Sequence, residues 1–173
     1  AANEWPNVTG ISHLLEHMMF KGSKDIGTTD YAKEIPYIQE TDKLGDQTIR
    51  LRQEMGEWRF AIFQEFGKQV SAGFTEEEKK AVGADKSKQI RLMVEKIRAM
   101  KQLPDELAKR PYLVEDDGVN YLDKYLAYET AWGDIARLLN EQRQYIVKDE
   151  LWETYMNNGS RFLNAGTSND FTV

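Results

Sequence analysis

The sequence predicts a mainly α-helical chain that ends in a short strand segment. Apolar residues recur every three or four positions through most of residues 28–156, whereas alternation at a period of two is seen only near the end, at Phe171 and Val173. The chain has 173 residues, of which 40% are hydrophobic and 30% charged. This composition is typical of a chain that buries a core, and it is far from that of a disordered chain.

The first helical pattern follows a loop-like stretch rich in glycine and threonine. Thr28 or Thr29 is expected to cap this helix, because a threonine hydroxyl can accept a hydrogen bond from a first-turn amide. The pattern runs to about Gly45, and Pro36 predicts a kink or a restart. A second stripe ends at Gly73, and its members are Leu51, Met55, Trp58, Ile62, Phe66 and Val70.

Two more apolar stripes follow. Thr75 and Glu78 have the spacing of a capping box, which is expected to start the helix whose apolar face is Ile90, Met93, Val94, Ile97 and Met100. Pro104 is expected to interrupt the helical pattern. Asp116 or Asp117 is expected to cap the last helix. The stripe of that helix is Leu122, Tyr125, Leu126, Trp132, Ile135, Leu139, Tyr145, Ile146, Trp152 and Met156, with a stop at Asn158 and Gly159. The tryptophans of these stripes (Trp58, Trp132 and Trp152) are expected in a helical core, with a docking surface as the alternative.

Three residues near the N-terminus carry the clearest chemical signal: His13, Glu16 and His17, in the segment GISHLLEHMMFKG. At about 100° per residue, all three side chains leave one face of a helix. Two imidazoles one turn apart can bind a tetrahedral Zn²⁺, and the carboxylate between them can take a proton from water. The motif predicts a metallohydrolase, against the alternative of two surface histidines beside a solvated glutamate.

The order H-x-x-E-H inverts the commoner zinc-peptidase order H-E-x-x-H. Residues 10–22 resemble the active-site helix of the pitrilysin/insulinase family of zinc metallopeptidases, which includes the mitochondrial processing peptidases. A second segment, FLNAGTSNDFTV, is similar to the strand that follows the zinc helix in that family. The residues that carry this second likeness are Leu163, Asn164, Ala165, Thr167, Ser168, Asp170 and Thr172.

The resemblance implies an α+β parent domain of the mitochondrial-processing-peptidase type. Residues 1–27 would be its zinc-helix part, 28–156 a helical insertion and 157–173 the strand segment that returns to the domain. Both ends of the chain then fall inside a domain, so we expect a fragment. The resemblance also implies a zinc-dependent endopeptidase that hydrolyses peptides or unfolded protein segments. The fragment by itself is expected to be inactive.

The resemblance assigns roles to particular residues. His13 and His17 would be zinc ligands and Glu16 the general base, with the third ligand a glutamate on a later helix outside this chain. Asn164 and Ala165 would bind substrate along the cleft strand, where the substrate adds as a further strand; for Asn164, a turn-forming role is the alternative. Glu95 is expected to be a solvated glutamate, and the acidic runs 76–78 and 115–117 are expected to be helix N-terminal charge.

The bulk properties restrict the partners. A net charge of -6 argues against a nucleic-acid or anionic-membrane surface, and no apolar run has the length of a membrane span. The absence of cysteine leaves the redox compartment open. Besides a peptide or protein substrate, a second family subunit or domain is a possible partner. The alternatives to an enzyme are a non-catalytic scaffold subunit of a peptidase pair and a helical interaction module. By analogy with bacterial relatives, an exported or periplasmic location is expected.

Overall fold

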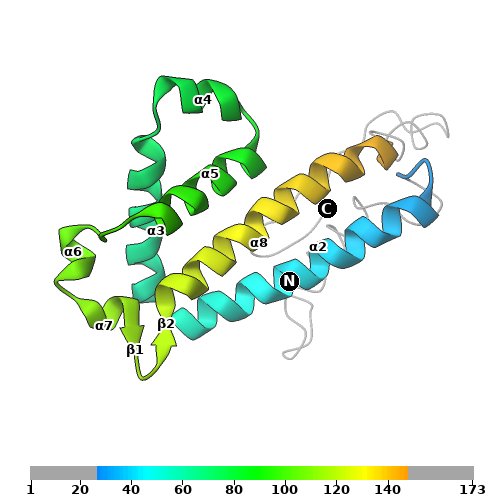
Figure 1. Ribbon diagram of the computed structural model, residues 1–173. Coiled ribbons are helices and arrows are strands. Elements are labelled where there is room, and N and C mark those ends of the chain that lie inside the picture. The colour runs from blue at the N-terminus through cyan, green and yellow to red at the C-terminus, as the bar shows by residue number, and fades with distance from the viewer. Residues whose placement is uncertain (1–26, 148–173) are drawn as a thin grey trace, which may run out of the picture. The chain divides into compact units, whose positions relative to one another are not determined.

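The computed structural model describes residues 27–147 (Figure 1). In chain order the described elements are α2 (Tyr31–Met55), α3 (Glu57–Ala72), α4 (Glu76–Val82), α5 (Lys86–Ala99), α6 (Asp105–Ala108), α7 (Pro111–Val114), β1 (Glu115–Asp116), β2 (Val119–Asn120), α8 (Tyr121–Gln142) and the 3-10 helix Arg143–Tyr145. Helices dominate this part of the chain, which confirms the mainly-α prediction. No helix within it is long and apolar enough to span a bilayer.

The described residues divide between two compact units. One is Pro36–Glu141, and the other contains residues 27–35 together with 142–147. Helices α2 and α8 each carry residues of both units.

Helix α2 begins one or two residues later than predicted and is much longer. The carboxylate of Asp30 accepts a hydrogen bond from the N–H of Lys33 (3.2 Å), so Asp30 rather than a threonine caps the helix. The hydroxyl of Thr28 instead accepts from the N–H of Asp30 (3.3 Å). The predicted restart at Pro36 and the end near Gly45 were wrong, because α2 continues through both residues.

A glycine divides the stripe that was predicted to run unbroken from Leu51 to Val70. Gly56 has φ 74°, a backbone conformation that favours glycine, and it separates α2 from α3. The break changes the helical phase, so Met55 is buried whereas the side chain of Trp58 is 58% exposed. The prediction that Trp58 packs in the core was wrong. Gly73 ends α3 as predicted, with its N–H donating to the carbonyl of Gln69 (3.1 Å).

The capping box at Thr75 is confirmed. Its hydroxyl accepts from the N–H of Glu78 (3.2 Å), and the carboxylate of Glu78 accepts from the N–H of Thr75 (2.8 Å). The helix that it starts is short, because α4 ends at Gly83, which has φ 53°. Asp85 caps a separate helix, α5. The predicted apolar face is buried on α5 at Met93, Val94 and Ile97, while Met100 lies beyond the helix and is exposed.

A small hairpin precedes α8, where only helix was expected. Strands β1 and β2 pair antiparallel across a turn at Asp117 (φ 48°) and Gly118 (φ 75°). Two successive positive φ angles suit a tight hairpin turn, for which Asp-Gly is a favoured pair. The prediction that Asp116 or Asp117 caps the last helix was therefore wrong. The side chain of Asn120 does so, by accepting a hydrogen bond from the N–H of Asp123 (2.9 Å).

Helix α8 is also shorter than its apolar stripe suggested. It ends at Gln142; Tyr145 closes the 3-10 helix and Ile146 is extended, so the predicted helical continuation through these two residues was wrong. The later stripe members Trp152 and Met156, and the stop at Asn158 and Gly159, lie outside the described residues.

The core of the Pro36–Glu141 unit lies where α3, α5 and α8 meet. The rings of Phe63 and Tyr125 stack there with centroids 5.5 Å apart, and the two side chains are 0% and 1% exposed. Trp132 is 41% exposed and makes an edge contact with the ring of Tyr128 (centroids 6.3 Å), so its predicted burial was wrong. The buried cluster consists of Met55, Phe60, Phe63, Phe66, Phe74, Met93, Val94, Ile97, Leu107, Leu113, Tyr125 and Leu126.

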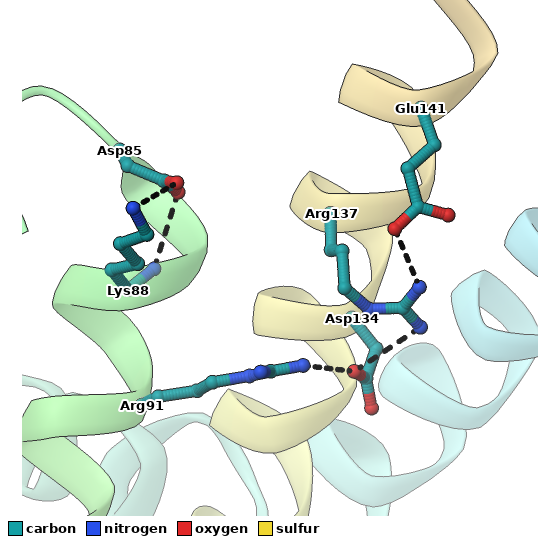
Figure 2. Close-up of polar contacts among 6 residues, drawn as sticks. All are labelled: Asp85, Lys88, Arg91, Asp134, Arg137 and Glu141. Atoms are coloured by element: carbon teal, nitrogen blue, oxygen red, sulfur yellow. Dashed lines mark hydrogen bonds and ion pairs between the residues drawn. The ribbon is translucent and has the colours of Figure 1, made fainter.

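A chain of ion pairs on the surface joins α5 to α8 (Figure 2). Arg91 reaches from α5 to Asp134 on α8 (3.3 Å), and Arg137 contacts both Asp134 (3.6 Å) and Glu141 (3.0 Å) along α8. Exposed pairs of this kind contribute about 0.2–1 kcal/mol each. The apolar core, rather than these charges, therefore decides how the helices pack.

Gly67 is the position where the packing leaves least room. A Cβ atom there would lie 2.1 Å from the Tyr125 hydroxyl oxygen and 3.0 Å from the Met93 sulfur. We expect Gly67→Ala to destabilise the unit by about 1–3 kcal/mol through overpacking, despite the better helix propensity of alanine. Urea unfolding measures this change. In the matched variant Gly45→Ala the Cβ meets nothing within 4 Å, so a gain of up to about 1 kcal/mol is expected. Equal stability of the two variants would refute the close approach.

Candidate functional site

The residues predicted to form the metal and substrate site all lie outside the described part of the chain. His13, Glu16 and His17 precede residue 27, and Asn164 and Ala165 follow residue 147. Their roles therefore stay predictions. What the structure adds is how the chain is arranged where these two segments attach to it.

The two ends of the described chain are hydrogen-bonded to each other. Thr28 and Ile146 form an antiparallel bridge. Beside it, the N–H of Thr29 donates to the carbonyl of Tyr145 (2.8 Å), and the N–H of Val147 donates to the carbonyl of Gly27 (3.0 Å). We call this pairing the neck. The segments that carry the predicted site residues thus attach at neighbouring points, although about 120 residues separate them in sequence.

A buried polar pair supports the neck. The side-chain amide of Gln142 donates to the carboxyl group of Glu34 (2.7 Å), and both residues are buried. A buried carboxyl group without a partner would cost several kcal/mol or more, whereas a hydrogen-bonded one is tolerated. The pair therefore ties the first turn of α2 to the end of α8. The sequence offered no local signal for this contact, because its two members lie 108 residues apart.

The described residues contain no candidate metal centre of their own. Among residues 27–147, no group of three or more His, Cys, Asp and Glu side chains is arranged to hold an ion. Glu95 is exposed, as expected of a solvated glutamate, and the run 76–78 forms the acidic first turn of α4 as predicted. The run 115–117 does not start a helix, which corrects the other prediction: it lies in β1 and the hairpin turn.

A cavity of about 530 Å³ opens among α3, α4, α5 and α8. Tyr125 and Glu129 line it from adjacent turns of α8. Burial raises the pKa of the Glu129 carboxyl above its ordinary value of 4.5, against the opposing influence of the Tyr125 hydroxyl and of the Lys86 charge. Burial and the neighbouring Glu129 also raise the pKa of the Tyr125 hydroxyl. Their i, i+4 spacing was visible in the sequence, but the cavity was not.

The raised pKa of Glu129 predicts a pH-dependent effect on stability. A raised pKa means that the folded chain binds the proton more tightly than the unfolded chain does. This contribution to stability is complete below about pH 4.5 and is lost as the pH rises through the folded pKa. Glu129→Gln keeps a hydrogen-bond acceptor and removes the charge. We therefore expect the variant to be more stable than the parent at neutral pH, with the difference vanishing near pH 4.

Urea unfolding at neutral pH and at pH 4 measures this difference. Glu95→Gln, at an exposed position of α5, serves as the control and should change stability little at either pH. Lower stability of Glu129→Gln at neutral pH, or an equal change in stability at both pH values, would contradict this prediction. Burial would then not be what raises the pKa of the Glu129 carboxyl.

Comparison with protein families gives a match over the first part of this chain. Residues 1–40 match the family model described as insulinase, peptidase family M16. The matched region includes His13, Glu16 and His17 and ends within α2. Searches of curated proteins and of solved structures found no match. The match supports a relationship to the M16 peptidases, a family that is generally zinc-dependent.

Proposed function

We propose that the protein containing this chain is a zinc-dependent endopeptidase acting on peptides or unfolded protein segments. The observation that carries this proposal is the family match over residues 1–40, within which the H-x-x-E-H motif lies. His13 and His17 are the proposed zinc ligands and Glu16 is the proposed general base.

The chemistry of this donor set suits zinc. Neutral imidazole nitrogens and carboxylate oxygens are common ligands of zinc in proteins, and a catalytic site uses three protein ligands with one open position. Residues 27–147 contain no cluster that could hold the ion independently. The third ligand is therefore proposed to be a glutamate from a part of the protein outside the described residues.

The proposed reaction assigns each residue a step. Zinc, when bound, would polarise the scissile carbonyl group and lower the pKa of water. Glu16 takes a proton from the attacking water and delivers it to the leaving amine. The segment around Asn164 and Ala165 binds the substrate as an added strand through backbone hydrogen bonds, which favours extended and unfolded segments.

The helical part is proposed to be an insertion in this peptidase. The neck supports that view, because an insertion must leave its host at nearly the point where it entered. The bridge between Thr28 and Ile146 and the hydrogen bond between Gly27 and Val147 meet this requirement. These contacts favour an insertion that ends near residue 147 rather than near residue 156.

Metal removal tests the proposed activity. The protein is assayed with an internally quenched, unstructured peptide before and after treatment with ortho-phenanthroline. We expect hydrolysis to fall to background as zinc is lost and to return when zinc is restored. The meta isomer, which does not chelate, is the control and should have no effect. Full hydrolysis by protein shown to be zinc-free would overturn the proposal.

A further inference from the structure

The cavity of about 530 Å³ in the Pro36–Glu141 unit has no role in the proposed peptidase reaction. All of its lining residues come from that unit. Its size falls in the range of about 300–1,000 Å³ that is usual for sites of small ligands. A ligand bound there would depend neither on zinc nor on peptide hydrolysis.

The inner wall of the cavity is apolar. Phe74 and Met93 are buried core residues that line it, and Val82 and Ile90 add partly buried aliphatic surface. Tyr125, which is almost wholly buried, lies beneath them. An apolar chain placed against this wall would be removed from water, which favours its binding.

The rim of the cavity carries three lysines. Lys68, Lys79 and Lys86 line it, against a single acidic residue, Glu129. Lys68 and Lys79 each have a carboxylate partner that does not line the cavity. Lys86 forms no ion pair within 4 Å among residues 27–147, although it is attracted to Glu129. Lys86 is therefore the rim lysine whose charge no ion pair within the described part of the chain compensates.

The apolar wall and the cationic rim together specify a ligand. A cationic head group would be repelled by Lys86, and a neutral one would leave the charge of Lys86 unused. We propose that this cavity binds a molecule with an apolar chain that ends in a carboxylate. The chain lies against Phe74, Ile90 and Met93, and the carboxylate lies at the rim with Lys79 and Lys86. A medium-chain fatty acid and the C-terminus of an apolar peptide both have this chemistry.

Calorimetric titration of the full chain distinguishes these sources and tests the proposal. Octanoate and acetyl-Leu-Leu with a free carboxylate are the two probes, and octylamine and acetyl-Leu-Leu amide are their matched controls. At least one carboxylate should bind saturably and at least about tenfold more tightly than its control, a difference of about 1.4 kcal/mol. Binding of octanoate alone identifies a fatty acid, and binding of the dipeptide alone a peptide terminus. The absence of saturable binding by both carboxylates, or equal binding of the controls, overturns the proposal.

Charge reversal at the rim locates the site. The double variant Lys79→Glu and Lys86→Glu is compared with Lys80→Glu and Lys88→Glu, which has the same net charge but changes lysines outside the lining. The rim variant should lose affinity for the carboxylate by about tenfold or more, and the control by less than about twofold. Circular dichroism verifies that both double variants are folded. Lys86→Gln and its control Lys88→Gln repeat the comparison with a charge removed instead of reversed. Equal losses in the two members of a pair would place the ligand elsewhere.

Discussion

In the protein that contains this chain, Glu16→Gln is expected to abolish peptide hydrolysis while zinc stays bound. Glutamine has nearly the shape of glutamate but cannot accept the proton from the attacking water. General acid–base catalysis contributes about 10²–10⁴-fold to rates of this kind, so we expect kcat to fall by about 10³-fold or more. The measurement is kcat on a quenched peptide together with zinc content by elemental analysis.

The control for this variant is Glu40→Gln, at a glutamate of α2 that lies within the matched region and forms an exposed pair with Lys43. Its kcat should stay within about twofold of the parent value, because exposed pairs contribute little. Turnover at the parental rate in Glu16→Gln would exclude Glu16 as the general base. Loss of both zinc and activity in Glu16→Gln would instead show that Glu16 is needed for zinc binding.

His17→Ala is expected to remove most of the bound zinc. A single imidazole cannot replace the pair that the motif provides. Residues that merely support a ligand already change metal affinity by about 10–100-fold, so loss of a ligand should cost more than about 100-fold. Competition with a chromophoric chelator gives the affinity directly. The control, Lys33→Ala, changes a cation at an exposed ion pair on α2 and should leave zinc affinity unchanged. Unchanged zinc affinity in His17→Ala would refute the ligand assignment.

Local signals in the sequence predicted local structure well. The capping box at Thr75, the end of α3 at Gly73 and the break before α6 at Pro104 were all confirmed, because each depends on a few adjacent residues. The break at Gly56 was missed because an apolar stripe can run across a change of helix axis. The break at Gly83 was missed because the capping box at Thr75 was assigned to the helix that carries Ile90. The Asp-Gly pair at 117–118 was a hairpin signal that the expectation of a helix cap obscured.

The site shows the same division between local and long-range information. His13, Glu16 and His17 could be singled out because their chemistry depends on spacing within one helical turn. The neck and the cavity could not, because Thr28 meets Ile146 and Gly67 meets Tyr125 only after the chain has folded. Helix periodicity identifies an apolar face, but it does not say which face of another helix will cover it.

Zinc K-edge X-ray absorption of the 173-residue chain tests the central assignment most directly. The chain has two histidines, so imidazole scattering around the metal can come only from His13 and His17, provided that the purification tag lacks histidine. With zinc added at millimolar concentration, we expect two imidazole nitrogens at about 2.0–2.1 Å. A shell of oxygen atoms without imidazole scattering would contradict the account.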